Sequence, residues 1–471
     1  MTSQLLSSRD DAGPDRLPQK PGWNWAAFLF GLCALLVLPA GEPRAAGQDI
    51  RFVRDTEIEN TIRLYVKPLF DVAGLNASFV RIVLIESPVL NAFVSGGQRI
   101  FMNTGLLRAA DDPTQVQGVL AHEIGHITGG HLIAMRDNLA KARATQIASM
   151  LLGLPLAIAS GRADAAVAAT AAGSQIATRQ FLAYSRGMEQ SADQAGVGFM
   201  DEARISTRGM AEFFQKLQAQ GRLYSADTDA YARTHPLTED RLAFVRNHAD
   251  QSPYSNIKPD PLLIAAHARM HAKLDGYLLA PETVLQRYSP DSKAMPDRYA
   301  RAVALMRLHR VDEALVLIDG LIAQEPQDGF FLEMRGEILR DAGRMREAIA
   351  AYRKAVEILP WAALIHARLG QTMLEIDDPT MDDEMIRHLR EAVRYEPWFT
   401  TAWRTLAGAY ARQGDIGNAA LSQAEGALRD GDLSMAKREA ERAMNTLPNA
   451  SPGWLRAEDI TLQTTPPEED G

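Results

Sequence analysis

The carboxy-terminal half of the chain repeats itself every 34 residues, and this period limits what it can fold into. Like residues keep this spacing in three sets: Pro326 and Pro360; Ala314 and Ala348; and Ala302, Gly336 and Gly370. Small residues are needed where two helices cross closely, and a proline can end a helical pair. Each unit of such a repeat buries its apolar face only by stacking on its neighbours. The spacing therefore predicts an all-α stack of helical pairs.

The residues within one period resemble a tetratricopeptide repeat. Met334 to Pro360, "MRGEILRDAGRMREAIAAYRKAVEILP", has small residues, an aromatic residue and a closing proline at positions typical of that repeat. A further copy begins at Trp403, and a copy around "IDDPTMDD" is three residues longer. The resemblance implies a tetratricopeptide solenoid over residues 293–449, preceded by connecting helices over residues 256–292. The tail, residues 450–471, is rich in proline and acidic residues and is expected to be disordered.

The amino-terminus has the three parts of a signal peptide. Three basic residues precede an apolar run from Trp25 to Pro39, and small residues follow around Ala45. An apolar core of ~7–15 residues before small residues is typical of exported proteins, so residues 1–47 are expected to be the signal peptide of a periplasmic protein. An uncleaved anchor that keeps the protein at the membrane is the alternative, although a membrane-spanning helix needs ~20 apolar residues.

Cysteine content and net charge argue against two classes of site. The one cysteine, Cys33, lies in the apolar run, so the mature chain is expected to have no disulfide and no thiolate metal ligand. The net charge is −9 and no basic stripe is present, which argues against nucleic acid as a partner.

Residues 48–255 predict a mixed domain with more helix than sheet. Residues 50–70 have the apolar spacing of a helix, and Phe79 to Glu86 is a β-branched run typical of a strand. Two short apolar runs flank a glycine pair in "NAFVSGGQRIFMNTGLL", which indicates a hairpin. A helix is expected from Pro113, with Asp112 as its cap.

Residues 144–178 are rich in alanine and predict a buried helical hairpin. The most apolar part, Ile147 to Gly161, is fifteen residues long, whereas a membrane span needs ~20. A mobile lid or an element on the membrane surface is the alternative, and the latter would give the protein a peripheral membrane contact.

The segment "LAHEIGHITGGHL" contains the pattern H-E-x-x-H, with His122, Glu123 and His126. Residues four apart lie on one face of a helix, so the two imidazoles can bind one zinc ion. Glu123 lies beside them and can take a proton from the attacking water. A catalytic zinc site needs a third protein ligand and leaves its fourth position open.

Glu189, on the next predicted helix, is the best candidate for the third ligand. Asp193 lies one turn further along, where its carboxylate can accept the outer N–H of a ligand histidine and fix its tautomer. Glu202 and Glu212 have no aspartate four residues on. His131 lies just beyond the motif, and we expect it to support the site rather than to bind the ion.

H-E-x-G-H followed about sixty residues later by E-x-x-A-D resembles the gluzincin family of the CAAX prenyl protease and its bacterial relatives. "NAFVSGGQRIFMNTGLL", "YSRGMEQSADQAG" and "THPLTEDRL" resemble its exported, tetratricopeptide-bearing subgroup, the β-barrel assembly-enhancing proteases. The resemblance covers about residues 50–450. It implies an α+β zincin-like metalloprotease domain, one Zn²⁺ per chain, endopeptidase activity and a role in outer-membrane protein quality control.

Two further residues extend the expected site. Arg241 can pair with an acidic residue near the site, with Asp193 as the candidate, and an exposed arginine is the alternative. His235 precedes a proline, which favours extended backbone, so it can reach inward from a loop. It is expected either to bind the ion as a fourth ligand and keep the enzyme silent, or to donate a hydrogen bond to the oxyanion. A loop histidine without a role is the third interpretation.

Asn91, Ala92 and Phe93 are expected to form the edge strand to which a substrate adds. Main-chain hydrogen bonds at a sheet edge bind extended segments without demanding a sequence, which suits unfolded or misassembled envelope proteins as substrates. The alternative is that Phe93 is simply a core residue.

Taken together, these features predict an exported zinc endopeptidase that degrades misfolded or stalled outer-membrane proteins while its repeats bind the outer-membrane assembly machinery. A periplasmic chaperone or adaptor with latent protease activity is the alternative from another class. An intramembrane prenyl-type protease has less support, because the sequence shows no clear span beyond the leader.

Overall fold

The computed structural model describes residues 51–77, 79–96, 98–138, 140–141, 143–144, 163–223 and 234–465. The expected signal peptide, residues 1–47, lies outside these ranges, and so does the most apolar part of the alanine-rich segment. None of the helices in the described ranges combines the length and the apolarity that a membrane crossing requires.

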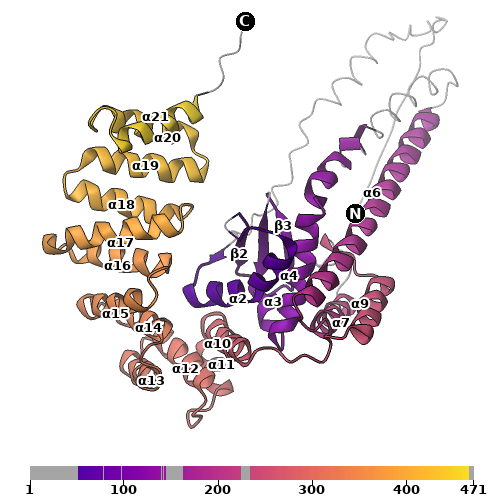
Figure 1. Ribbon diagram of the computed structural model, residues 1–471, viewed down its shortest axis with the longest axis horizontal. Helices are drawn as coiled ribbons and strands as arrows, with labels where there is room; N and C mark the ends of the chain where they lie inside the picture. The colour runs from indigo at the N-terminus through magenta and orange to yellow at the C-terminus, as the bar shows by residue number, and fades with distance from the viewer. Residues whose placement is uncertain are drawn as a thin grey trace, which may run out of the picture. The chain divides into compact units, whose positions relative to one another are not determined.

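A four-stranded sheet forms near the start of the described chain, in the order β1-β2-β4-β3 (Figure 1). The strands are β1 (Phe52–Val53), β2 (Arg81–Ile85), β3 (Ala92–Ser95) and β4 (Arg99–Asn103). β2 and β4 run parallel, while β3 and β4 form the expected antiparallel pair, with Ala92 opposite Met102. β3 and β1 therefore lie at opposite edges of the sheet.

Six helices of the first part of the chain pack with this sheet around one apolar core. They are α2 (Thr56–Ala73), α3 (Thr104–Ala109), α4 (Pro113–Thr128), α6 (Ala163–Glu202), α7 (Arg208–Leu223) and α9 (Glu239–Gln251). α4 contacts α2, α6 and α7, and it is buried along most of its length. It begins as the sequence predicts, because Asp112 accepts a hydrogen bond from the main-chain nitrogen of Thr114.

α4 and α6 cross very closely at Gly125. A Cβ atom on Gly125 would lie 2.7 Å from the carbonyl oxygen of Ala192, so any side chain would push the two helices apart. This glycine lies inside the H-E-x-x-H pattern. The close crossing brings Glu189 and Asp193 of α6 alongside the two histidines of α4.

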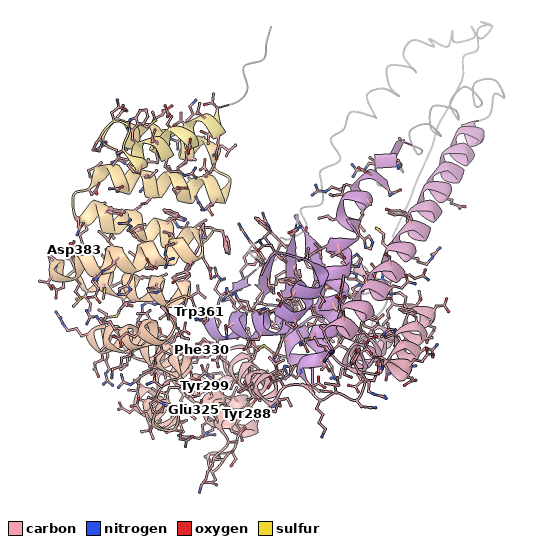
Figure 2. All side chains as sticks on the ribbon, in the orientation of Figure 1. Tyr288, Tyr299, Glu325, Phe330, Trp361 and Asp383 are labelled. Atoms are coloured by element: carbon pink, nitrogen blue, oxygen red, sulfur yellow. The ribbon has the colours of Figure 1, made fainter. Side chains whose placement is uncertain are left out.

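The rest of the chain is a series of helices, most of which pack on the next one along the chain (Figure 1). They are α10 (Pro261–Leu278), α11 (Pro281–Arg287), α12 (Met295–Arg307), α13 (Val311–Gln324), α14 (Gly329–Asp341), α15 (Met345–Ile358), α16 (Ala363–Ile376), α17 (Asp382–Tyr395), α18 (Thr400–Arg412), α19 (Ile416–Asp430), α20 (Leu433–Met444) and α21 (Pro452–Thr464). Figure 2 labels Tyr299 of α12 and Phe330 of α14, whose neighbour Phe331 packs edge-on against the Tyr299 ring.

The 34-residue period has a direct structural cause. A Cβ atom on Gly336 would lie 2.5 Å from the Tyr352 ring, and one on Gly370 would lie 2.5 Å from Leu389, so both glycines allow close helix crossings. The three extra residues around "IDDPTMDD" form a 3₁₀ turn, η1 (Pro379–Met381), between α16 and α17.

The expected disorder of residues 450–471 is wrong for its first part. Residues 452–464 form α21, which packs on α19 and α20 and buries Ala457 and Ile460. Ser451 caps this helix by accepting from the main-chain nitrogen of Trp454, and Pro452 occupies its first turn. The prediction of disorder rested on composition, whereas these two residues are typical of a helix start. Residues 466–471 lie outside the described ranges.

Candidate metal centre

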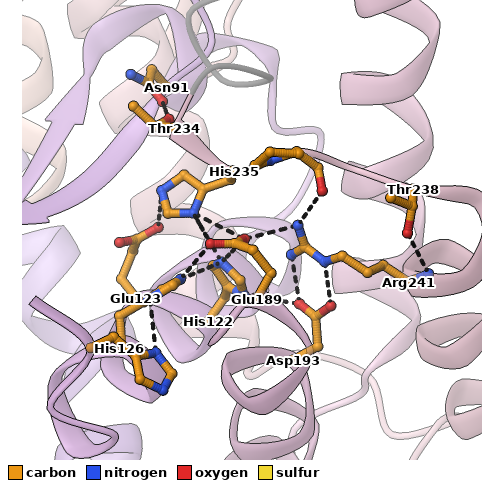
Figure 3. Close-up of polar contacts among 12 residues, drawn as sticks. Asn91, His122, Glu123, His126, Glu189, Asp193, Thr234, His235, Thr238 and Arg241 are labelled. Carbon is orange, nitrogen blue, oxygen red and sulfur yellow. Dashed lines mark hydrogen bonds and ion pairs between the residues drawn. The ribbon is translucent and has the colours of Figure 1, made fainter. Parts of the chain in front are cut away.

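Four side chains from three parts of the chain meet at one point (Figure 3). His122 and His126 come from α4, Glu189 comes from α6, and His235 comes from the segment before α9. One ligand atom from each lies within 4.8 Å of the others, and it is the only such group of metal-binding side chains among the described residues. Three of the four were expected as ligands from the sequence. The fourth, His235, was expected as a latch or as an oxyanion donor, with a loop histidine without a role as the third interpretation.

The distances between these atoms suit a small tetrahedral ion. Nε2 of His122 lies 3.1 Å from Nε2 of His126, 3.3 Å from Nδ1 of His235 and 3.4 Å from Oε2 of Glu189. Glu189 is also 3.3 Å from His126 and 3.2 Å from His235. A tetrahedral zinc ion with bonds of ~2.0–2.1 Å places its ligand atoms about 3.3–3.4 Å apart. The imidazole and carboxylate groups present therefore fit such an ion in chemistry and in spacing.

Asp193 and Arg241 contact members of the four-residue cluster and hold them in position. Oδ1 of Asp193 lies 2.9 Å from Nδ1 of His122, which turns Nε2 of that ring toward the cluster. Arg241 donates to both oxygens of Asp193, at 2.6 and 2.9 Å, and lies 2.8 Å from Glu189. It also donates to the carbonyl oxygen of Pro236, the residue after His235. The buried guanidinium thus ties α6 to the loop that carries His235, and Arg241 is not the exposed arginine of the alternative interpretation.

The carboxylates govern the protonation of the cluster. Burial lowers the pKa of His122, but Asp193 and Glu189 outweigh this and raise the pKa to about 9. Burial raises the pKa of Glu189, yet hydrogen bonds from three histidines hold that pKa well below its ordinary value. A metal ion that binds Nε2 of His122 must displace its proton, so metal affinity at this site rises with pH.

Glu123 lies next to the cluster and is fully buried. Its two carboxylate oxygens make no hydrogen bond to the described residues, and Oε1 lies 3.5 Å from Nε2 of His235. A buried carboxylate without hydrogen bonds is costly, and such groups concentrate at functional sites. Its position is that of a base that acts on a molecule bound at the cluster.

His131 supports the cluster without entering it. Its Nδ1 lies 3.0 Å from Nδ1 of His126, on the side of that ring turned away from Glu189. Burial lowers the pKa of His131 to about 4, with a further contribution from His126, so its ring is neutral near pH 7. A neutral His131 can hold the orientation of the His126 ring.

The predicted edge strand lies next to the cluster. Ala92 and Phe93 belong to β3, and Asn91 directly precedes it. Ala92 is buried in the core, while Phe93 is half-buried and stacks on Phe101 with ring centroids 5.1 Å apart. The side-chain oxygen of Asn91 lies 3.3 Å from the hydroxyl of Thr234, which precedes His235.

Two features of the site escaped the sequence analysis. The contact between Asn91 and Thr234 joins positions 143 residues apart, so no local pattern reports it. Gly125 could have been found, because a glycine inside a helical pattern indicates close packing or function.

Part of the chain matches a known protein family. Residues 56–249 match peptidase family M48, a range that begins with α2 and ends within α9. This range contains all four side chains of the cluster, together with Glu123, Asp193 and Arg241.

Several curated proteins are similar to more of the chain. A beta-barrel assembly-enhancing protease of Yersinia pestis is 27% identical over 395 residues, which are 79% of this chain and 77% of that protein. The protein of the same name from Escherichia coli (strain K12) is 30% identical over 281 residues, 58% of this chain and 56% of that protein. The human mitochondrial metalloendopeptidase OMA1 is 26% identical over 43% of this chain and 40% of that protein. The chain thus spans only about half the length of some of these relatives.

Proposed function

We propose that this chain, a metalloendopeptidase with a peptidase family M48 domain over residues 56–249, uses one zinc ion to cleave misfolded or stalled outer-membrane proteins in the periplasm. The convergence of His122, His126 and Glu189 beside Glu123 carries the proposal. The printed names of the bacterial relatives, beta-barrel assembly-enhancing protease, support outer-membrane proteins as the substrate class.

Each residue of the centre has a distinct task in this proposal. A zinc ion held by His122, His126 and Glu189 would supply a Lewis acid for the scissile carbonyl and the attacking water. Glu123 takes a proton from that water and returns it to the leaving amine. Asp193, whose Oδ1 lies 2.9 Å from Nδ1 of His122, keeps that ring aligned.

The sheet edge supplies substrate binding in this proposal. β3 lies at the edge of the sheet, next to the cluster, so an extended segment can add to its outer main chain. Such binding reads the backbone rather than the sequence. It favours chains that are unfolded where they are cut.

The substrate class can be tested with one β-barrel protein in two states. We expect the unfolded chain to be cleaved at least about tenfold faster than the same protein folded in detergent micelles, because a folded barrel seldom opens an extended segment. Initial rates are followed by gel electrophoresis, with a chelator-treated sample as the control. Equal rates for the two states would contradict the proposed preference.

His235 is proposed to be a latch. Its Nδ1 already lies among the ligand atoms, 3.3 Å from His122 and 3.2 Å from Glu189. A fourth protein ligand takes the position that a catalytic site must leave open for water. His235 also lies 3.5 Å from Glu123. In this position it would block both the open position on the ion and access of water to the base. This observation also favours the second candidate function, a chaperone or adaptor whose protease activity is latent.

Replacing His235 by alanine distinguishes the two roles considered for this residue. If the open form is ~10% populated, loss of the latch raises casein cleavage about tenfold while zinc is retained. Loss of an oxyanion donor would instead lower cleavage by ~10²–10³-fold. Casein cleavage and zinc content are measured on the same sample, and His248→Ala, a half-exposed histidine on α9 outside the cluster, serves as the control. Unchanged cleavage would contradict both roles.

The stacked helices α12 to α20 are proposed to be a tetratricopeptide solenoid that binds the outer-membrane assembly machinery. The 34-residue spacing and the glycines at helix crossings support this assignment. Repeat stacks of this kind expose extended surfaces for protein partners.

A further inference from the structure

A cavity lies away from the metal centre, between the start of the described chain and the stacked helices. Its volume is about 670 Å³. Its walls come from β1, the start of α2, the ends of α10 and α12, and α14, α16 and α18. Its lining contains no residue of the metal centre, and β1 is at the sheet edge opposite β3. The proteolytic chemistry therefore does not account for this cavity.

One wall of the cavity carries a carboxylate whose second oxygen has no hydrogen bond. Glu333, on α14, is 9% exposed. Its Oε1 accepts a hydrogen bond from the Thr56 hydroxyl at 2.6 Å, but its buried Oε2 makes none to the described residues. Glu337, one turn further along α14, also lines the cavity, and its Oε2 accepts from the Tyr277 hydroxyl at 2.7 Å. A buried oxygen of this kind indicates a site for a donor or a cation.

The basic residues beneath the cavity are engaged by other carboxylates. Lys273 and Arg269, both on α10, form ion pairs with three acidic residues: Asp55, Glu57 and Asp328. Lys273 is 1% exposed, so its ammonium is held in place rather than free to follow a ligand. Lys273 also attracts Glu333 and Glu337, but it shares its single charge with Asp55 and Glu57.

The cavity lining contains four arginines. Three of them have other partners: Arg51 with Glu86, Arg54 with Glu59 and Glu396, and Arg307 with the carbonyl oxygens of Gly276 and Leu279. Arg368 is near Glu337, yet burial outweighs its influence and raises the pKa of that carboxyl. Burial likewise raises the pKa of Glu333 to about 8, in spite of Lys273. A further positive charge at these carboxylates would thus be favourable.

We propose that this cavity binds a basic side chain of a partner polypeptide, with its charged end at Glu333 and Glu337. Apolar lining residues such as Leu274, Leu364 and Phe399 suit the aliphatic stem of such a side chain, whereas a hydrated metal ion makes no use of them. The polar lining residues Gln371, Thr401 and Thr405 can bond to the main chain on either side. The volume falls within the ~300–1,000 Å³ of ordinary ligand pockets, which leaves room for neighbouring residues.

The test compares lysine with norleucine, which keeps the stem and lacks the ammonium. Two fluorescein-labelled alanine–serine decapeptides, acetylated and amidated, carry either two central lysines or two norleucines. Binding to the full-length chain is measured by fluorescence anisotropy in the Glu123→Gln background, so that the peptides are not cut. We expect the lysine peptide to bind at least about tenfold more tightly, since truncating one partner of a buried charge pair usually costs more than this factor. An arginine peptide shows whether the cavity discriminates between the two basic side chains.

Variants of the two carboxylates locate the binding. Glu333→Gln and Glu337→Gln should each weaken binding of the lysine peptide at least about tenfold and leave the norleucine peptide unaffected. Glu347→Gln alters the exposed ion pair between Glu347 of α15 and Arg344, and it should change the binding of neither peptide. Glu333→Gln should not lower the unfolding temperature, because the amide can still accept from Thr56 and no buried charge remains. If Glu333→Gln does lower the unfolding temperature, Glu337→Gln tests the same cavity at a half-buried residue, where a loss of stability is not expected.

Three outcomes would overturn the proposal. Equal binding of the lysine and norleucine peptides would show that no charge is recognised. A lysine preference that survives both carboxylate variants would place the binding elsewhere. Displacement of the lysine peptide by millimolar MgCl₂, at an ionic strength matched with NaCl, would show that the carboxylates bind inorganic cations instead.

Discussion

Glu123→Gln is expected to lower peptide hydrolysis by ~10²–10⁴-fold while the protein keeps its fold and its metal. Glutamine has the shape of glutamate but cannot take a proton from water. Glu123 is not among the four converging ligands, so metal content should not change. The carboxylate is fully buried and makes no hydrogen bond to the described residues, so its neutral replacement should not destabilise the protein.

Initial rates on a quenched casein substrate and metal analysis of the same sample check this expectation. Glu212→Gln is a suitable control, because Glu212 is exposed on α7 and the amide can still accept from Gln115. Activity within a few-fold of the wild type would remove Glu123 as the base, and His235, whose Nε2 lies 3.5 Å from Glu123, would be the next candidate.

The parts of the site that follow helical spacing were predictable from the sequence. His122 and His126 are one turn apart on α4, and Glu189 and Asp193 are one turn apart on α6. Such spacing places two side chains on one face whatever the rest of the chain does. The pairing of Arg241 with Asp193 was also predictable, because a buried arginine near the site needs a carboxylate partner. Nε of Arg241 lies 2.6 Å from Oδ2 of Asp193.

The position of His235 was only half predictable. Its proline neighbour indicated a loop, but the approach to His122 depends on the Arg241 bond to Pro236 and on the contact between Thr234 and Asn91. Both contacts bring together elements whose order in the chain does not reveal their proximity. The sequence therefore left the roles of latch and oxyanion donor open, and the position of Nδ1 among the ligand atoms supports the proposed latch.

The cavity beside Glu333 left no trace in the sequence analysis. Its charged lining residues come from distant parts of the chain, among them the segment around β1, α12, α14 and α16. Thr56 and Glu333, which share a hydrogen bond beside it, are separated by 277 residues. In the repeat pattern, Glu333 and Glu337 look like ordinary charged residues on a helix surface. Only the packing of α14 against the start of α2 makes one of them buried, which no local spacing can report.

Glu189→Gln is expected to lower zinc affinity by more than about 100-fold and to abolish hydrolysis. Loss of a residue that merely orients a metal ligand costs ~10–100-fold in affinity, and loss of a ligand should cost at least as much. The amide also presents an N–H₂ group, which would either face the ion or meet the guanidinium of Arg241, 2.8 Å from Oε2 in the present structure. Competition with a chromophoric chelator measures the affinity, and Glu202→Gln, an exposed residue at the end of α6, is the control.

The same variant separates the roles of Glu189 and His235, because both lie within reach of His122 and His126. If His235 is only a latch, the Glu189→Gln protein keeps at best a weak site of three histidines, and adding His235→Ala removes what remains. If His235 is the permanent third ligand, Glu189→Gln retains zinc at full affinity, and His235→Ala alone loses it. The carboxylate assignment rests on the charge that Glu189 brings, because a carboxylate neutralises part of the charge of a divalent ion and two neutral imidazoles do not.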